Sequence, residues 1–226
     1  VSYYGSGSSN TDGSINTTST SVSTTAGFSI STYTGTGSEA TVGHGLGVKP
    51  DMILIKRRDA SGTWHVYHQI VTADAVVELD TTAVLKDNAN FMNDTEPTTS
   101  VFTVNTYDEV NASSGTLVAY AFAPKQGFSK FGSYEATQSA DGPFVYTGFR
   151  PAFVMLKNID YAKNWYIYNN KTLGYNERND YLDANTTDVE ESGNNEFDLL
   201  SNGFKLRSTG TGTNKSGDTY IYMAFA

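Results

Sequence analysis

An internal duplication spanning residues 27–226 limits the folds open to this chain more than any other feature. Short motifs return in the same order in its second half, and their offset drifts only from 100 to 103 residues, which a few small loop insertions explain. The matched stretches are Gly27-Phe28-Ser29 with Gly127-Phe128-Ser129, Pro50–Lys56 with Pro151–Lys157, Trp64–Tyr67 with Trp165–Tyr168, Leu79-Asp80 with Leu182-Asp183, and Ala121-Phe122-Ala123 with Ala224-Phe225-Ala226. A unit of this length is too long for a solenoid repeat and predicts two similar small domains or subdomains.

Both halves show the alternation of apolar and polar residues that is typical of β-strands, with turns rich in Gly, Asn and Asp. Helical signal is nearly absent, and the stretch 183–191, with 82–87 as its counterpart, could form a single turn at most. The expected strands are 28–33, 52–57, 64–68, 76–79, 101–104 and 116–122, and then 128–134, 153–157, 165–168, 180–182, 204–207 and 220–225. The second and third of these, joined by the turn 59–62, are expected to form a hairpin.

The predicted fold class is therefore all-β, with two homologous antiparallel β-sandwich-like repeats of about 100 residues packed together. The predicted boundaries are 27–124 for the first repeat and 125–226 for the second, because the joint Pro124-Lys125-Gln126 is short. Residues 1–26 are nearly all Ser, Thr, Gly and Asn, so they are interpreted as a linker or arm that cannot bury a core of its own. Within them, 17–23 could still add a strand to an exposed sheet edge.

Composition excludes several classes of protein. Cysteine is absent, so neither disulfides nor thiolate metal sites can form. The net charge is −9 and the cations are scattered singly, which argues against nucleic acid as a partner. No long apolar segment predicts membrane insertion. Charged residues make up only 17% of the chain while small polar and aromatic residues abound, a balance that favours an extracellular or virion-surface protein.

Several longer motifs carry a resemblance to a known kind of protein. They are 9–15 (Ser-Asn-Thr-Asp-Gly-Ser-Ile), 41–48 (Thr-Val-Gly-His-Gly-Leu-Gly-Val) with Pro50 and Lys56-Arg57-Arg58, 131–134, 141–151 (Asp-Gly-Pro-Phe-Val-Tyr-Thr-Gly-Phe-Arg-Pro) and 200–205. Together they resemble the duplicated β-rich domain of unknown function found in predicted tail-fibre and other virion-surface proteins of bacteriophages. The resemblance implies a place on the virion, and it supplies no catalytic or binding residue.

Three residues are candidate ligand-binding residues. His44 lies among Gly43, Gly45 and Gly47, where the backbone could approach a ligand closely, or where a tight loop could simply need glycine. Trp64 and Trp165 are the only tryptophans and occupy equivalent positions. They could stack a sugar or anchor a protein interface, although a duplicated tryptophan is most simply an anchor of each repeat's core.

We expect neither a metal nor a cofactor. His65 and His68 are three residues apart on one strand and so point to opposite faces, where they cannot chelate one ion. The acidic stretch Asp180, Asp183, Asp188, Glu190 and Glu191 lacks regular Ca²⁺-ligand spacing and is interpreted as a solvated loop. The sequence contains no nucleophile elbow, zinc-protease motif or phosphate loop, and we expect no enzyme activity.

The leading hypothesis is a non-enzymatic structural protein of a phage virion surface: a tail fibre, a knob or a capsid decoration module that contributes to host attachment. Its expected partners are other copies of itself, in a trimer or larger symmetric assembly, other virion proteins and a host-surface glycan. One alternative is a carbohydrate-binding receptor-recognition module. Another is a glycan-cleaving tail enzyme, for which the sequence shows neither a long β-helix nor an acidic cleft.

Overall fold

The computed structural model describes residues 7–171, 176 and 178–226. The fold is all-β and antiparallel, and the chain divides into two compact units. Unit 1 contains residues up to Glu78 and the range Leu85–Lys125, whereas unit 2 contains Leu79–Val84 and Gln126–Ala226. No helix within the described residues is both long enough and apolar enough to cross a membrane.

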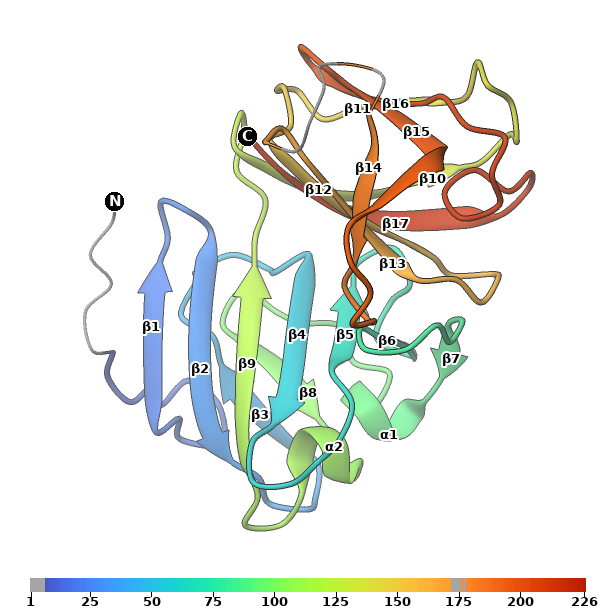
Figure 1. Ribbon diagram of the computed structural model, residues 1–226. Coiled ribbons are helices and arrows are strands. Elements are labelled where there is room, and N and C mark those ends of the chain that lie inside the picture. Colours follow the sequence, from blue (N-terminus) through green and yellow to red (C-terminus); the bar gives the residue numbers. More distant parts are fainter. Residues whose placement is uncertain (1–6, 172–175, 177) are drawn as a thin grey trace. The chain divides into compact units, whose positions relative to one another are not determined.

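The main sheet of unit 1 has seven strands in the order β1-β2-β9-β4-β5-β6-β7 (Figure 1). Tyr33, Ile53 and Leu117 alternate with outward-facing neighbours and enter the core, as a sheet with one packed face requires. The strands are β1 (Ser19–Ser23), β2 (Phe28–Thr34), β9 (Thr116–Phe122), β4 (Met52–Arg57), β5 (His65–His68), β6 (Ala75–Glu78) and β7 (Lys86–Asp87). The predicted hairpin is confirmed, because β4 pairs with β5.

A second layer covers the inner face of this sheet. It consists of the paired strands β3 (Ala40–Gly43) and β8 (Val101–Val104) and two single helical turns, α1 (Ala89–Met92) and α2 (Asp108–Asn111). Figure 1 shows this layer behind the main sheet. Val42, Phe91, Phe102 and Val110 supply its buried side chains. The helical turns therefore lie outside the stretches 82–87 and 183–191, where the sequence allowed one.

The segment before β2 is folded onto unit 1 from Ser8 onward. Ser8 and Thr20 exchange main-chain hydrogen bonds, and β1 pairs along β2, so a Ser/Thr strand extends the sheet edge as its composition allowed. Ile15 forms a parallel bridge with Val42 and is only 6% exposed within the core. The stretch interpreted as a linker or arm thus covers the first unit, and a single isoleucine anchors it.

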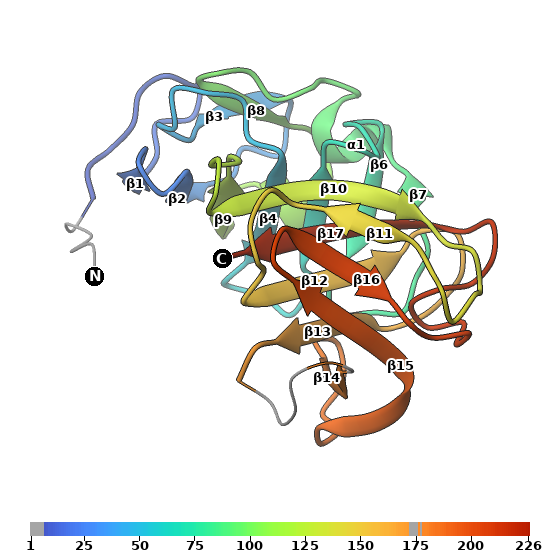
Figure 2. The ribbon, with the colours of Figure 1, turned by 90° about the horizontal axis from the view of Figure 1, so that it is seen from above.

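The sheet of unit 2 has eight strands in the order β10-β17-β12-β13-β14-β15-β16-β11. It curls over itself, and in Figure 2 β11, β16 and β15 lie over β10, β17 and β12. Ring contacts between Tyr134 and Phe204 and between Tyr168 and Phe197 join the two layers. The strands are β10 (Ser129–Glu135), β11 (Phe144–Tyr146), β12 (Phe153–Asn158), β13 (Trp165–Asn169), β14 (Arg178–Asp183), β15 (Glu191–Leu200), β16 (Gly203–Leu206) and β17 (Thr219–Phe225).

Candidate functional site

Hydrogen bonds of two buried polar side chains, Tyr33 and Asn111, join the two layers of unit 1, and we call this pair the polar latch. The Tyr33 hydroxyl donates to the Val110 carbonyl at 2.7 Å. The fully buried Asn111 accepts at Oδ1 from the Thr36 N–H and donates through Nδ2 to the carbonyls of Ser38 (2.7 Å) and Asn105 (2.8 Å). These bonds satisfy main-chain groups that a buried loop would otherwise leave without partners. The latch therefore stabilises the fold.

Unit 2 contains a latch of the same kind. The Tyr134 hydroxyl donates to the Thr213 carbonyl at 2.7 Å. Asn214 is fully buried, accepts from the Thr137 N–H and donates to the carbonyls of Ser139 (2.9 Å) and Ser208 (2.7 Å). Burial raises the pKa of Tyr134 well above its ordinary value, so the hydroxyl stays a donor.

His44 is fully buried and used by the fold. Its Nδ1 accepts from the Leu46 N–H at 3.1 Å, which makes Nε2 the donor toward the Thr98 carbonyl at 3.3 Å. Burial lowers the pKa of His44 and favours this neutral ring. Gly45 and Gly47 have φ of +70° and +72°, the left-handed conformation that glycine adopts without strain. The candidate histidine closes a tight loop between β3 and β4.

The two tryptophans have different surroundings. Trp165 begins β13 and is 1% exposed, and its main-chain N–H donates to the side chain of Asn185 at 2.8 Å. Its ring is therefore inaccessible to a sugar in this structure. Trp64 precedes β5 and is half-buried. Of the two, only Trp64 presents part of its ring at the surface.

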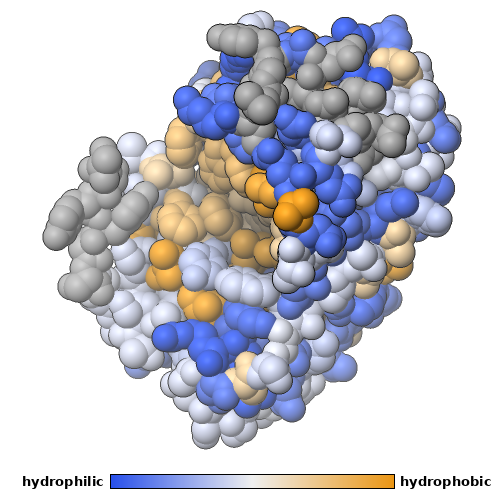
Figure 3. Space-filling view, viewed as in Figure 1, coloured by the Kyte–Doolittle hydropathy of each residue, from blue (hydrophilic) through white to orange (hydrophobic). Residues whose placement is uncertain are grey.

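Trp64 belongs to a strip of half-buried aromatic rings on the outer face of the unit 1 sheet, which we call the aromatic strip: Phe28, Trp64, Tyr120 and Phe122. Tyr120 is central, with its ring centroid 5.9 Å from that of Trp64 and 6.4 Å from the parallel ring of Phe28. Phe28 lies 4.8 Å from Phe122. Apolar residues are uncovered over β2, β9 and β4 on this face (Figure 3).

The chemistry of the aromatic strip suits a ligand with both an apolar and a polar side. Ile30 and Leu54 lie opposite Tyr120 on the two neighbouring strands and extend its apolar surface. Lys56 places its Nζ 5.9 Å from the centroid of the Trp64 ring and donates to the Gly62 carbonyl. A cation and a phenol beside stacked rings can bind hydroxyl or carboxylate groups while the rings take an apolar surface.

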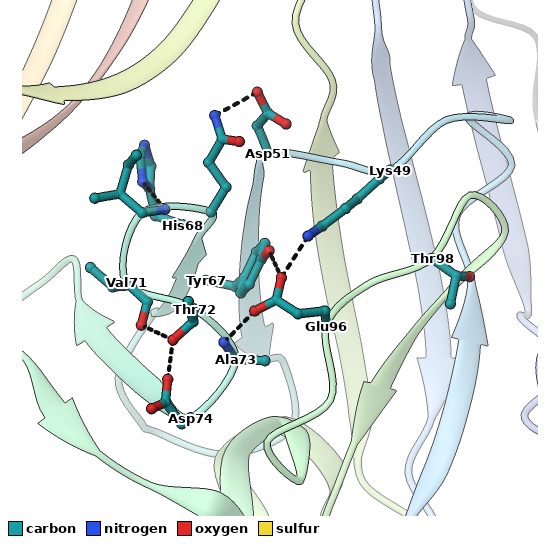
Figure 4. Close-up of polar contacts among 12 residues, drawn as sticks. Lys49, Asp51, Tyr67, His68, Val71, Thr72, Ala73, Asp74, Glu96 and Thr98 are labelled. Carbon is teal, nitrogen blue, oxygen red and sulfur yellow. Dashed lines mark hydrogen bonds and ion pairs between the residues drawn. The ribbon is translucent and has the colours of Figure 1, made fainter.

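A polar cluster lies at the β5–β6 end of unit 1, and Figure 4 shows Lys49 and Tyr67 both pointing at Glu96. The Tyr67 hydroxyl donates to Glu96 Oε2 at 2.6 Å and Lys49 Nζ lies 2.7 Å from the same oxygen, while the Ala73 N–H donates to Oε1 at 2.8 Å. Although burial opposes ionisation, these donors together hold the pKa of Glu96 below its ordinary value. The carboxylate is saturated by groups of the fold.

Asp51 lies beside this cluster. The Gln69 Nε2 donates to Asp51 Oδ2 at 2.8 Å (Figure 4). Burial is the largest influence on the carboxyl and raises its pKa to about 6, although Lys49 and Gln69 favour the charged form. The group therefore titrates within a range that is accessible to experiment.

Three residues of the predicted acidic stretch come together in unit 2. One carboxylate oxygen each from Asp183, Asp188 and Glu191 lie within 4.8 Å of one another. Burial, with Glu191 and Asp188 nearby, raises the pKa of Asp183. The Tyr181 hydroxyl donates to Glu191 at 2.8 Å, and Asn164 donates to Asp183. Asp188 and Glu191 are exposed, as expected for a solvated segment. The prediction of a loop holds only for Asp188 and Glu190, because Asp180 and Asp183 lie in β14 and Glu191 begins β15.

Some of the residues that shape these sites carried no recognisable motif. Tyr120 and Phe28 lie on predicted strands, but their place beside Trp64 depends on the order of the strands in the sheet, which no motif marks. Asn111 and Asn214 stand 103 residues apart, the offset of the final repeated motif, and that signal marks them as a matched pair.

The chain matches a family model described as a domain of unknown function (DUF7483) over residues 2–226. It therefore belongs to this family along its whole length. No curated protein and no solved structure matches it significantly.

Proposed function

We propose that this member of the family is a non-enzymatic structural protein of a phage virion surface, built from two homologous units. The setting is supported by the motifs that resemble phage tail-fibre and virion-surface proteins. The structural role is supported by the use of the buried polar side chains, since those of His44, Asn111 and Asn214 all bind main-chain groups of their own unit.

The observation that carries the proposal is the repetition of the polar latch. Tyr33 and Tyr134 each donate to the carbonyl of the residue immediately before the latch asparagine, Val110 or Thr213. Each tyrosine ring also packs edge-on against a phenylalanine, Phe102 at 6.3 Å and Phe204 at 6.1 Å. Strand orders agree as well: β2-β9-β4-β5-β6 in unit 1 corresponds to β10-β17-β12-β13-β14 in unit 2.

A matched lysine contact adds to this argument. Lys56 donates to the carbonyl of Gly62, and Lys157 donates to the carbonyl of Lys163, so donor and acceptor both recur after 101 residues. What the two units share is the internal bonding of a rigid scaffold. Such a scaffold suits a tail fibre, knob or capsid decoration module assembled into a trimer or larger symmetric ring.

Electron cryo-microscopy of intact particles, with an antibody fragment raised against the purified chain, tests this proposal. The fragment should decorate one type of virion structure with its rotational symmetry. Purified virions that lack the chain would contradict the proposal. Release of reducing ends from host-surface polysaccharide by the purified protein would contradict its non-enzymatic part.

The second candidate function is carbohydrate recognition, and the aromatic strip favours it. Half-buried Trp64, Tyr120 and Phe28 offer ring faces together on one side of a sheet, as a platform for the apolar face of a pyranose would. We expect Trp64→Ala and Tyr120→Ala to lose binding to a glycan array of host polysaccharides. Tyr161→Ala, at a 45% exposed tyrosine of unit 2, is the matched control and should keep it. No glycan binding by the intact chain would contradict this function.

A further inference from the structure

The strand β11 is the last of the unit 2 sheet, and one of its edges has no strand partner in the part of the chain that the structure describes. Among the described residues it pairs only with β16. The Leu206 N–H donates to the Pro143 carbonyl, and the Thr147 N–H donates to the Asn202 carbonyl. Because main-chain groups alternate in direction along a strand, those of Val145 also face β16, while those of Phe144 and Tyr146 face away from it.

In unit 1 the corresponding edge is covered. The strand β3 pairs with β8 as β11 pairs with β16, and Val42 lies opposite Phe102 as Val145 lies opposite Phe204. This alignment places Thr41 where unit 2 has Phe144, and it rests on the proposal that the two units are homologous.

The residues that cover the unit 1 edge belong to the N-terminal segment. The Ile15 N–H donates to the Thr41 carbonyl at 2.9 Å, and the Thr41 N–H donates to the Ser14 hydroxyl at 2.9 Å. The Ile15 side chain enters the core beside Val42. One short extended segment therefore satisfies both main-chain groups of Thr41 and adds an aliphatic anchor.

Side chains near this edge are slightly more exposed in unit 2 than their counterparts in unit 1, as expected if no segment covers the edge in unit 2. Val42 is 0% exposed and Tyr33 is 1% exposed, whereas Val145 and Tyr134 are each 7% exposed. At the edge itself, Phe144 and Tyr146 are 44% and 58% exposed. The only side chain that bonds this edge within the described residues is Lys130, whose Nζ donates to the Tyr146 carbonyl at 2.6 Å.

We propose that the β11 edge is a docking site for an extended, Ser/Thr-rich peptide segment of a partner polypeptide. By analogy with residues 13–15, the segment would run parallel to β11, donate one N–H to the Phe144 carbonyl, accept from the Phe144 N–H through a hydroxyl, and place an aliphatic side chain beside Val145. Strand addition of this kind takes its affinity from main-chain bonds and its specificity from the side-chain anchor. A three-residue strand offers few bonds, so we expect weak binding, with a Kd of about 10⁻⁵–10⁻⁴ M.

The test uses the full chain and a fluorescent peptide with the sequence of residues 8–20, followed by fluorescence anisotropy. The matched control peptide replaces the isoleucine at position 15 with aspartate. In the protein, Phe144→Pro removes the outward N–H but keeps the β11–β16 bonds, a substitution that edge strands tolerate. Phe144→Ala keeps that N–H and is its control.

We expect the native peptide to bind, the aspartate peptide to bind at least tenfold more weakly, and Phe144→Pro to lose binding while Phe144→Ala retains it. Hydrogen exchange should show new protection at Phe144. The proposal is overturned if the peptide does not bind, or if protection appears at β3 instead, since the peptide would then have displaced the native segment of unit 1. Self-association of the chain through β11 without peptide would also overturn it. Particle localisation is measured separately, so failure here leaves the virion proposal standing.

Discussion

Asn111 and Asn214 make the same hydrogen bonds in their respective units. Each Nδ2 donates to the carbonyl of the residue six positions earlier in the chain, Asn105 or Ser208. Each also donates to a carbonyl in the loop that follows β2 or β10, that of Ser38 or Ser139. Both side chains are fully buried. Two sets of loops with different sequences are thus stabilised by the same pattern of hydrogen bonds from an asparagine side chain.

Replacing either asparagine with alanine should destabilise its unit. Each change leaves buried carbonyls and at least one buried N–H without a partner, so we expect a loss of about 2–4 kcal/mol in the free energy of unfolding. Because the two amides share no bonding partner, the double variant should lose roughly the sum of the two effects. Urea denaturation of the three variants measures this. A cost below about 0.5 kcal/mol would show that the latch is not a stabilising element.

The sequence predicted the strands well where alternation was strong and poorly where it was not. The six predicted strands of each half overlap strands of the structure, with shifts of one or two residues at most ends. The strands β3, β7, β11 and β15 were not predicted. Ala40–Gly43 ends in glycine, and Phe144–Tyr146 is only three residues long, so neither shows enough alternation to stand out.

The candidate site was predicted only in part. The pairing of Trp64 with Trp165 suggested equal roles, yet the structure buries Trp165 and leaves Trp64 half-exposed. The aromatic strip depends on strand order, because Tyr120 reaches Trp64 and Phe28 only when β9 lies between β2 and β4. Strand order is not encoded in local periodicity, so the strip could not be assembled from the sequence.

The two tryptophans should respond differently to truncation. Trp165→Ala removes a ring that is 1% exposed and should cost about 3–5 kcal/mol of unfolding free energy. Trp64→Ala should cost clearly less and keep the near-ultraviolet circular dichroism of the remaining aromatics. Equal destabilisation by the two changes would contradict a surface role for Trp64.

Asp51 predicts a specific dependence of stability on pH. Burial raises its pKa from 3.8 to about 6, so between these values the folded state binds more protons than the unfolded state. Stability must then fall as pH rises from 4 to 6. Asp51→Asn should therefore be more stable than the wild type at pH 7, and the gap should close below pH 4. Thermal melts across this range measure it.

Asp59→Asn is the control with the opposite sign. The Arg57 guanidinium donates to Asp59 at 3.0 Å and lowers the pKa of that carboxyl. The bond between the Asp59 carboxylate and Arg57 stabilises the fold above the ordinary aspartate pKa, and this effect is lost as pH falls. Asp59→Asn should therefore be less stable than the wild type at neutral pH. A wild-type minus Asp51→Asn difference that is flat from pH 4 to 6 would contradict the assignment.

Lys157 predicts a second pH dependence, at high pH. The side chain is fully buried, donates to the carbonyls of Lys163 at 2.6 Å and Thr82 at 3.2 Å, and burial lowers its pKa from 10.5 to about 8. Between these values the unfolded state binds more protons, so stability contributed by this residue rises with pH. The stability of the wild type should therefore increase relative to that of Lys157→Met between pH 8 and 10, as measured by the midpoints of urea denaturation. A constant difference would contradict a buried ammonium.

The N-terminal segment gives a prediction that separates its two possible roles. If it serves as an intramolecular cover, Ile15→Ala should cost about 2–4 kcal/mol, because the side chain is 6% exposed in the core of unit 1. Val22→Ala, at a 41% exposed position of the same segment, should cost less than about 1 kcal/mol. Light scattering of Ile15→Ala should give the mass of the wild type. A lower mass with unchanged stability would instead assign the segment to subunit assembly, since a residue that holds copies together affects association without affecting the core of one unit.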